Sequence, residues 1–460
     1  NKLCRNILWG QRGNFLSVPT DCPQRDERLG WTGDILAFCR AATYNADVNG
    51  FFCKWLGDVR DGQREDGAFY DLAPRVWGNE VGNAAWAEAA LVVAWNTYLM
   101  YGDLRIIEEN YDAMERFMQQ RATQVFDGYK YNGGGITHGD WLAPEGNEPE
   151  KKRYIAVCFY AYSARLMQKM SEIMAKYHGK KYEQKALEYK ILYNNIKNEF
   201  QTRYINSDGA LTQDGQTTYL LALKLDLFPD TQSVNKAITH LDNLIKSNDN
   251  RLGTGFVGTA IINQTLSEYW LSETAYNLLL QRKNPSWLYS VDQGATTIWE
   301  RWNGYTYESG FHPQTSMNSF NHYAYGAVLE WMFRYMAGIN PDKNNPGFKH
   351  IILSPHIDLR NIIPAGQKRI TYVDASYESH YGKISSSWKI NEKKDNIKYD
   401  FTIPANTTAT VILHLQDKYN KIKCNQRSLN KVSGIISHKT DDTRFIINLL
   451  PGKYSFTIGK

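Results

Sequence analysis

The spacing of apolar residues changes once along this chain, near residue 340, and this change constrains its fold more than any other feature. Before it, apolar residues recur every three or four positions, as they do over 155–174. That spacing predicts amphipathic helices. After it, apolar and polar residues alternate over 397–403, which predicts a strand with one buried face. We therefore expect a helical domain followed by an all-β domain.

The helical pattern dominates the first part of the chain. It covers nine stretches, at residues 34–58, 83–100, 104–124, 155–174, 181–201, 215–225, 232–246, 255–280 and 318–337. The stretch 83–100 is apolar nearly all round, which is typical of a helix buried between others. Roughly a dozen helices joined by long loops favour a toroid of helix pairs over a four-helix bundle.

The last part of the chain has the pattern of a β-sandwich. Further strands are expected at 408–415, 444–449 and 454–458, and strands that are short and closely spaced are typical of this fold. The segment 340–347 (Asn-Pro-Asp-Lys-Asn-Asn-Pro-Gly) has the composition of a turn-rich linker. The predicted fold class is mostly α, with a helical domain over 1–340 and an all-β sandwich over 341–460.

Charge, hydropathy and cysteine spacing exclude several classes of protein. Lys and Arg number 53 against 48 Asp and Glu, and no Lys/Arg block stands out, so no nucleic-acid partner is expected. No run of 18 uncharged apolar residues exists, and even Ala84–Trp95 contains Glu88, so no membrane span is expected. The six cysteines form no Cys-x-x-Cys pair and no zinc-like spacing with histidine. No ligand spacing therefore demands a metal.

Aromatic residues are the unusual part of the composition, at 13% of the chain with 30 Tyr and 13 Trp. Only Trp388 follows residue 340, so the excess of tryptophan belongs to the helical domain. Indole rings stack on the C–H faces of sugars while polar neighbours bond the hydroxyl groups. A tryptophan-rich core would give the same composition, and composition leaves both interpretations open. The lone Trp388 favours a structural role for the sandwich over sugar binding.

The densest polar cluster is the segment 21–34, Asp-Cys-Pro-Gln-Arg-Asp-Glu-Arg-Leu-Gly-Trp-Thr-Gly-Asp. Its four carboxylates and two arginines stand among proline and glycine, which predicts a structured loop rather than a helix face. Carboxylates beside arginine and tryptophan experience opposing effects on their pKa, so one acid can stay protonated while another ionises. The alternative is a salt-bridged loop leading into a helix that Thr32 or Asp34 caps.

A second cluster surrounds Glu300, which lies between two tryptophans and next to Arg301. Such a carboxylate has restricted solvent access and an adjustable pKa. The alternative is a buried Glu300–Arg301 pair within a helix. Downstream, His322 stands among small polar residues at an expected helix start, where a lone histidine is more often structural than catalytic.

Glycoside hydrolysis requires two carboxyl groups from separate segments on either side of one bond. Glu27 and Glu300 are the two that stand among aromatic residues rather than on plainly solvated faces. Trp86 and Trp141 are candidate platforms for a sugar. Trp86 begins a highly apolar stretch, so core packing explains it equally well.

At these motifs the chain resembles the bacterial α-L-rhamnosidases of glycoside hydrolase family 78. The resemblance extends over nearly the whole chain, and the loop Asp21–Asp34 is its most specific part. The other matching motifs are Arg5–Phe15, Gly139–Leu142, Thr297–Trp302, Ser319–Tyr323, Pro346–Ile351, Tyr381–Trp388 and Ile403–Ala409.

The resemblance implies an (α/α)6 barrel followed by a C-terminal β-sandwich, with no metal or cofactor. It implies hydrolysis of terminal, non-reducing α-L-rhamnosides, from glycosides or polysaccharide side chains, with inversion of configuration. By motif, Glu27 resembles the general acid and Glu300 the general base that activates water. The residues that match sugar-binding positions are Asp21, Arg25, Trp31, Asp34, Trp86, Trp141 and His322.

Members of the family usually carry further β-rich domains before the barrel, whereas this chain begins at what resembles the first barrel helix. We therefore expect the C-terminal part of a longer bacterial enzyme, in the periplasm or secreted. Two alternatives remain open. The first is an exo-glycosidase for another deoxy sugar or a uronic acid. The second is a catalytically silent carbohydrate-binding or scaffold protein. Such a protein would be expected to lack one of the two carboxylates, whereas both Glu27 and Glu300 are present in their motifs.

Overall fold

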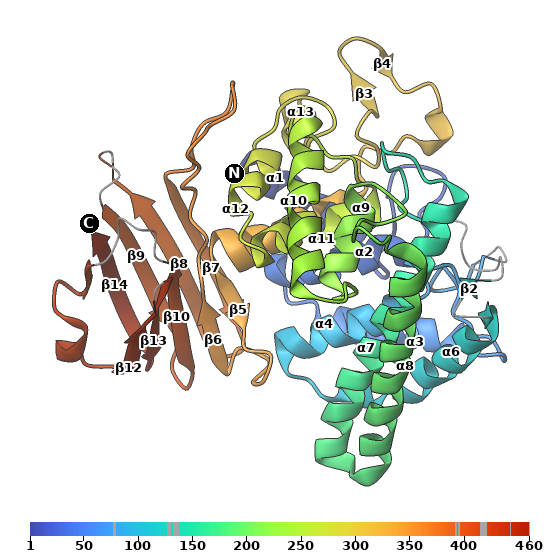
Figure 1. Ribbon diagram of the computed structural model, residues 1–460, viewed down its shortest axis with the longest axis horizontal. Helices are drawn as coiled ribbons and strands as arrows, with labels where there is room; N and C mark the ends of the chain where they lie inside the picture. The colour runs from blue at the N-terminus through green and yellow to red at the C-terminus, as the bar shows by residue number, and fades with distance from the viewer. Residues whose placement is uncertain are drawn as a thin grey trace. The chain divides into compact units, whose positions relative to one another are not determined.

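The computed structural model divides into two compact units (Figure 1). The first comprises Asn1–Asn96 and Leu104–Val328, and the second comprises Thr97–Asp103 and Leu329–Lys460. The structure describes residues 1–76, 80–126, 130–131, 138–391, 393, 396–414, 421–441 and 443–459. The domain bounds 1–340 and 341–460 stay a prediction.

Helices make up most of the first unit, although residues 97–101 of the fourth helix belong to the second (Figure 1). They are α1 (Lys2–Asn14), α2 (Thr32–Asn45), α3 (Asn49–Asp61), α4 (Ala89–Tyr101), α5 (Arg105–Glu108), α6 (Tyr111–Gln124), α7 (Pro149–His178), α8 (Lys180–Tyr204), α9 (Gln216–Lys224), α10 (Thr231–Ser247), α11 (Phe256–Glu268), α12 (Ser272–Leu279) and α13 (Trp287–Asp292). Two-residue strands pair as β1 (Val125–Phe126) with β2 (Lys130–Tyr131), and as β3 (Tyr305–Thr306) with β4 (Gly310–Phe311).

The long stripe over 155–174 is confirmed as one face of α7. Most of its apolar residues are buried, and Pro149 stands in the first turn, where its missing N–H costs no hydrogen bond. Helix α8 packs along α7, and the two run side by side as the longest pair in Figure 1. Gly179, with φ of +83°, makes the sharp turn between them.

Several predicted helices have different bounds, and the stretch 104–124 divides into α5 and α6. The stretch 34–58 is two helices, because the Asp47 carboxylate accepts a hydrogen bond from the Asn49 N–H (3.1 Å) and α3 begins there. The stretch 255–280 divides at Trp270, whose φ is +66°. The helix expected from residue 83 begins only at Ala89, because Ala85 has a φ of +68°. Left-handed backbone at these positions ends helical hydrogen bonding.

The region 318–337 is not one regular helix. The 3₁₀ turn η1 (Thr315–Met317) ends just before it, and it contains the 3₁₀ helix η2 (Tyr323–Ala327), the short α14 (Val328–Trp331) and a π-helical turn η3 (Met332–Met336). The break before η2 leaves His322 at the N-terminal cap of that helix. The expected helix start near His322 is thus present.

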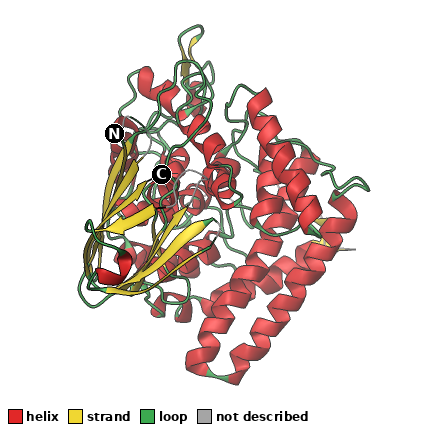
Figure 2. Ribbon diagram, turned by 60° about the vertical axis from the view of Figure 1, so that its left-hand side comes forward, coloured by secondary structure: helices red, strands yellow, loops and turns green. Residues whose placement is uncertain are grey.

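The second unit is a sandwich of two five-stranded sheets (Figure 2). The first has the order β12 (Ile435–Thr440), β13 (Arg444–Leu449), β10 (Thr408–His414), β6 (His350–Leu353) and β5 (Ile339–Pro341). The second has the order β11 (Lys421–Cys424), β14 (Gly452–Gly459), β9 (Asn396–Ile403), β8 (Gly382–Ile390) and β7 (Tyr372–Ser379). Leu415, expected to end β10, lies outside the described residues.

The core of the sandwich follows the alternation seen in the sequence. In β9 every second residue from Ile397 to Ile403 is buried, and Phe456 of β14 packs near Phe401. Trp388 is buried and its indole N–H donates to the Met336 carbonyl oxygen (2.8 Å). The predicted fold class, mostly α followed by an all-β sandwich, is confirmed. Among the described residues, none of the helices has both the length and the apolar character needed to cross a membrane.

Candidate active site

The loop Asp21–Asp34 is folded onto the Asp21 carboxylate. Asp21 Oδ1 accepts the Leu29 N–H (2.9 Å), and the Asp21 N–H donates to the Leu29 carbonyl oxygen (2.8 Å). The Cys22 thiol donates to Asp21 Oδ2 (3.1 Å). Burial, together with the nearby charges of Asp34 and Glu27, raises the pKa of Asp21 to about 6, although His322 opposes the shift. These bonds join the first residue of the loop to Leu29 near its end.

Arg25 joins carboxylates from two distant segments. Its Nη1 donates to Glu300 Oε2 (2.8 Å) across 275 residues of sequence, and its Nε donates to Glu27 Oε2 (2.9 Å). Its Nη2 lies 3.5 Å from Asp21 Oδ2. Burial lowers the pKa of Arg25, but Glu300 and Glu27 outweigh it and the pKa is raised, so the guanidinium stays charged. The structure therefore brings both predicted catalytic carboxylates to one arginine.

Hydrogen bonds to the segment around Ser319 hold both the backbone and the side chain of Glu300. Its N–H donates to the Ser319 carbonyl oxygen (2.9 Å), and the Ser319 N–H donates to Glu300 Oε2 (3.2 Å). Gln24 Nε2 donates to Ser319 Oγ (2.8 Å), which ties this segment to the loop. The alternative of a Glu300–Arg301 pair in a helix is wrong, because Glu300 lies outside the helices and Arg301 Nη1 contacts His312 Nδ1 (2.7 Å).

Glu27 is the more open of the two carboxylates. Its side chain is 22% exposed, whereas that of Glu300 is 2% exposed. The indole N–H of Trp31 donates to Glu27 Oε1 (2.6 Å), so each carboxylate oxygen of Glu27 has its own donor. Trp31 is the N-terminal cap of α2, and that cap has no side-chain hydrogen bond. The capping of α2 by Thr32 or Asp34 is therefore wrong.

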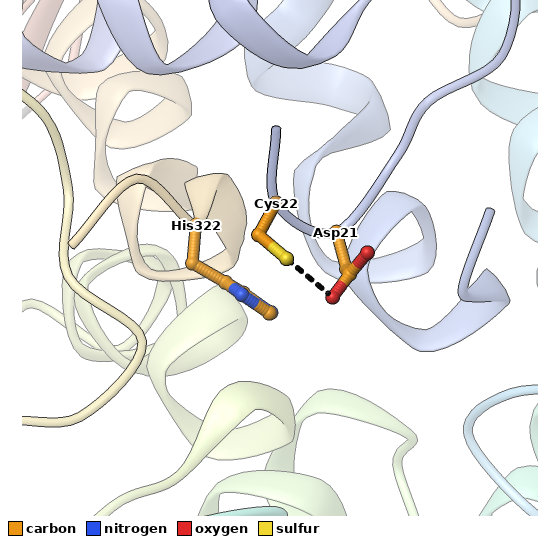
Figure 3. Close-up of side chains that lie close together, drawn as sticks. All are labelled: Asp21, Cys22 and His322. Atoms are coloured by element: carbon orange, nitrogen blue, oxygen red, sulfur yellow. Dashed lines mark hydrogen bonds between the residues drawn. The ribbon is translucent and has the colours of Figure 1, made fainter. Parts of the chain in front are cut away.

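Asp34 instead pairs with His322. Asp34 lies in the first turn of α2, and its Oδ1 is 2.6 Å from His322 Nε2. Both side chains are buried. Burial lowers the pKa of His322, but the carboxylates of Asp34 and Glu300 outweigh it and raise the pKa to about 9. His322 is thus charged at neutral pH, and Figure 3 shows its ring facing Asp21 and Cys22.

The charge on His322 predicts a loss of stability in alkaline solution. The folded-state pKa of about 9 lies above the unfolded value of about 6.5, so the stabilisation is complete below pH 6.5 and is lost as the pH rises through 9. In His322→Asn this dependence should disappear. Urea unfolding across that pH window measures it. An equal decline in the free energy of unfolding of both proteins would contradict the prediction.

Two of the predicted site tryptophans, Trp86 and Trp141, lie beside the N-termini of helices α2 and α11. Trp86, only 4% exposed, lies across Gly33 in the first turn of α2, where an added Cβ would be 2.2 Å from the indole Cε2. Trp141 is half-buried and follows Asp140, whose carboxylate accepts the N–H groups of Gly255 (2.8 Å) and Val257 (2.8 Å) at the start of α11. Such a carboxylate at a helix N-terminus fixes the backbone on either side of it.

The three tryptophans meet at a residue that the sequence analysis missed. The His138 ring lies 4.4 Å from Trp86, 5.7 Å from Trp141 and 6.1 Å from Trp31, measured between ring centroids. Trp86 is nearly fully buried in this cluster, as core packing predicts, and its role as a sugar platform stays a prediction. The one sequence signal for His138 was its place directly before the motif Gly139–Leu142.

Among the residues that the structure describes, two groups of side chains have ligand atoms close enough for a metal ion: Asp21 with Cys22 and His322, and Asp71 with Glu80 and His138. The first fits a cation poorly. Burial raises the pKa of the Cys22 thiol to about 12, and His322 carries a proton at neutral pH. In the second, Asp71 already accepts the Asn83 N–H (3.1 Å). Both groups are explained by hydrogen bonds and ion pairs.

Cavities flank the segment that carries Glu300. One of about 410 Å³ is lined by residues that include Trp299 and Phe320, and one of about 320 Å³ by residues that include Arg301 and Leu142. A third cavity, of about 920 Å³, lies at the end of α3. None of the three is lined by a predicted site residue, but the lining of the first two includes the chain neighbours of Glu300 and Trp141.

Comparison with known proteins identifies the family. The family model described as the bacterial alpha-L-rhamnosidase 6 hairpin glycosidase domain matches residues 1–336. The chain belongs to this bacterial α-L-rhamnosidase family. The model of the bacterial alpha-L-rhamnosidase C-terminal domain matches residues 338–427. The resemblance inferred from the motifs, and the helical barrel of the six-hairpin type that it implied, are confirmed.

Individual rhamnosidases match along nearly the whole chain. An alpha-L-rhamnosidase of Formosa agariphila is 36% identical over 99% of this chain and 47% of its own length. One of Streptomyces avermitilis is 39% identical over 89% of this chain and 37% of its own length. The chain thus spans less than half the length of these curated relatives.

Solved structures of rhamnosidases have the same fold. The crystal structure of the Streptomyces avermitilis alpha-L-rhamnosidase complexed with L-rhamnose matches 99% of this chain and 41% of its own, with 36% identity and a TM-score of 0.88. The alpha-L-rhamnosidase from Dictyoglumus thermophilum matches all of this chain and 49% of its own, with 29% identity and a TM-score of 0.86.

Proposed function

We propose that this chain carries the active site of an inverting exo-glycosidase that removes terminal, non-reducing α-L-rhamnose from glycosides or polysaccharide side chains. One observation carries the proposal: Arg25 bonds the carboxylates of both Glu27 and Glu300, which come from opposite ends of the helical unit. A guanidinium that bonds both carboxylates offsets their mutual repulsion and holds them in one site. An inverting pair needs carboxyl groups about 6.5–9.5 Å apart to admit a water molecule.

The different exposure of the two carboxylates supports their roles. Glu27, at 22% exposure, is the general acid that protonates the glycosidic oxygen, because the departing group of an exo-acting enzyme faces solvent. Glu300, at 2% exposure, is the general base that takes a proton from the attacking water on the opposite face of the sugar. Backbone and arginine donors hold Glu300 in a single orientation.

The remaining site residues bind the sugar. Asp21, Arg25, Asp34 and His322 are the polar groups for the hydroxyls, and Trp31, Trp86 and Trp141 form the wall for the C–H faces and the methyl group. Recognition of a methyl group alone is worth about 1–3 kcal/mol. An inverted hydroxyl should cost more, because it leaves a buried polar group unpaired. The residues supply this chemistry without a metal or cofactor, and a periplasmic or secreted location stays the prediction.

A panel of aryl glycosides tests the proposal. The purified chain should hydrolyse an aryl α-L-rhamnopyranoside with a higher kcat/KM than the matching α-L-mannoside, α-L-fucoside or β-D-glucuronide. Faster hydrolysis of another glycoside would favour an exo-glycosidase for that sugar. Binding of L-rhamnose without turnover of any glycoside would favour a catalytically silent carbohydrate-binding protein.

A further inference from the structure

His138 is buried at the centre of the tryptophan cluster and has no role in the chemistry proposed above. Its imidazole contacts all three indoles, edge to face with Trp31 and Trp141 and tilted against Trp86. A ring that touches three others in this way limits how far each can turn, because close-packed aromatic groups have few alternative arrangements. The side chains of the wall are thus linked through one residue.

Asp71 anchors this imidazole. His138 Nε2 lies 3.2 Å from Asp71 Oδ2, and Asp71 is fully buried. Asp71 Oδ1 accepts the Asn83 N–H (3.1 Å), so the carboxylate cannot follow the ring if the ring moves. The half-exposed Glu80 adds a second contact, its Oε2 3.3 Å from His138 Nε2. One ring nitrogen of the imidazole therefore lies against two carboxylates, while the ring packs against the three indoles.

The same aspartate segment also joins the backbones that carry two of the tryptophans. The carbonyl oxygen of Asp71 accepts the N–H of Thr32 (2.9 Å), and Leu72 forms an isolated bridge with Trp31. On the other side, Asn83 accepts the N–H of Trp86 (3.1 Å) through its carbonyl oxygen. Asp71 thus holds the backbone of the wall, and His138 holds its rings.

We propose that His138 is the positioning residue of the sugar pocket: anchored on Asp71, its imidazole holds Trp31, Trp86 and Trp141 as one wall that selects the methyl group of L-rhamnose. This inference rests on the proposed function. It assigns the discrimination between rhamnose and its close analogues to a residue that touches the wall rather than the sugar. Loss of the ring should therefore weaken selection more than it weakens the chemical step.

The test compares two aryl glycosides that differ only at this methyl group. An aryl α-L-lyxopyranoside is the α-L-rhamnopyranoside without the methyl group. The ratio of kcat/KM for the rhamnoside to kcat/KM for the lyxoside does not depend on the fraction of active enzyme. In His138→Gln, which retains a donor for Asp71 but has no ring, the ratio should fall about tenfold, within the range for one methylene-sized contact. KM for the rhamnoside should rise, with a smaller change in kcat. His138→Phe retains a ring and should restore most of the ratio.

His178→Gln is the matched control. His178 forms a similar pair with a carboxylate, its Nε2 2.6 Å from Glu108 Oε1, at the exposed end of α7. The ratio should be unchanged in this variant. A wild-type ratio in His138→Gln would overturn the inference while the proposed function stands. A wild-type chain that hydrolyses neither glycoside would instead contradict the proposed function.

Discussion

Glu300→Gln should lower kcat for an aryl α-L-rhamnoside by several orders of magnitude and change KM little. The amide preserves the shape of the side chain, and its oxygen can still accept hydrogen bonds from Arg25 and Ser319. It cannot take a proton from water. A positioned general base contributes about 10²–10⁴-fold. Steady-state kinetics on the aryl glycoside measures the loss. Undiminished activity would remove Glu300 from the role of base.

Glu27→Gln should also lower activity strongly, with a different dependence on the leaving group. A general acid matters most for leaving groups that need protonation, so hydrolysis of a rhamnosyl disaccharide should suffer more than that of a nitrophenyl glycoside. Glu300→Gln should reduce both alike. The matched control is Asp26→Asn, because Asp26 adjoins Glu27 in the loop yet its side chain is fully exposed. Equal losses on both substrates in Glu27→Gln would contradict its role as acid.

Arg121→Met should destabilise the helical unit by about 3–5 kcal/mol, the usual cost of leaving a buried charge without its partner. Arg121 Nη2 lies 2.5 Å from Glu88 Oε1, and both side chains are buried. Burial already raises the pKa of Glu88, an effect that Arg121 opposes. Glu88 Oε2 also accepts the Ala85 N–H (2.7 Å) next to Trp86, so activity should fall as well. Urea unfolding measures the change.

The control for this prediction uses the same helix. Arg116, also in α6, bonds Gln63 at the surface, and Arg116→Met should change the free energy of unfolding little. The double variant Glu88→Leu with Arg121→Met should recover much of the loss, because neither charge is then buried alone. Equal effects of Arg116→Met and Arg121→Met would show that the buried pair is not the source of the stabilisation.

Periodicity predicted the elements whose burial is regular. The apolar stripe of α7 and the apolar–polar alternation of β9 could be predicted from the sequence, because each element buries one face along its whole length. The helix breaks near Asp47 and Trp270 were missed, because one carboxylate contact or one left-handed residue decides them and the apolar pattern continues across both.

The candidate site was predictable in its residues but not in its pairing. Motifs pointed to Glu27 and Glu300, and the local sequence offered Arg301 as an alternative partner of Glu300, whereas the structure pairs Glu300 with Arg25. The contact between Arg25 and Glu300 joins residues 275 positions apart, so it depends on the tertiary fold of the helical unit. The spacing of residues within either segment cannot predict it. His138 was missed for the same reason, since its partners come from three separate segments.

The central claim is that Glu27 and Glu300 act on opposite faces of a terminal α-L-rhamnoside with inversion of configuration. Proton NMR of the first sugar released from an aryl α-L-rhamnopyranoside tests it most directly, provided that spectra are recorded before the anomers equilibrate. β-L-rhamnose should appear first, followed by slow mutarotation to the α anomer. If α-L-rhamnose appears first, the enzyme retains configuration, and the assignment of Glu300 as a base that activates water is contradicted.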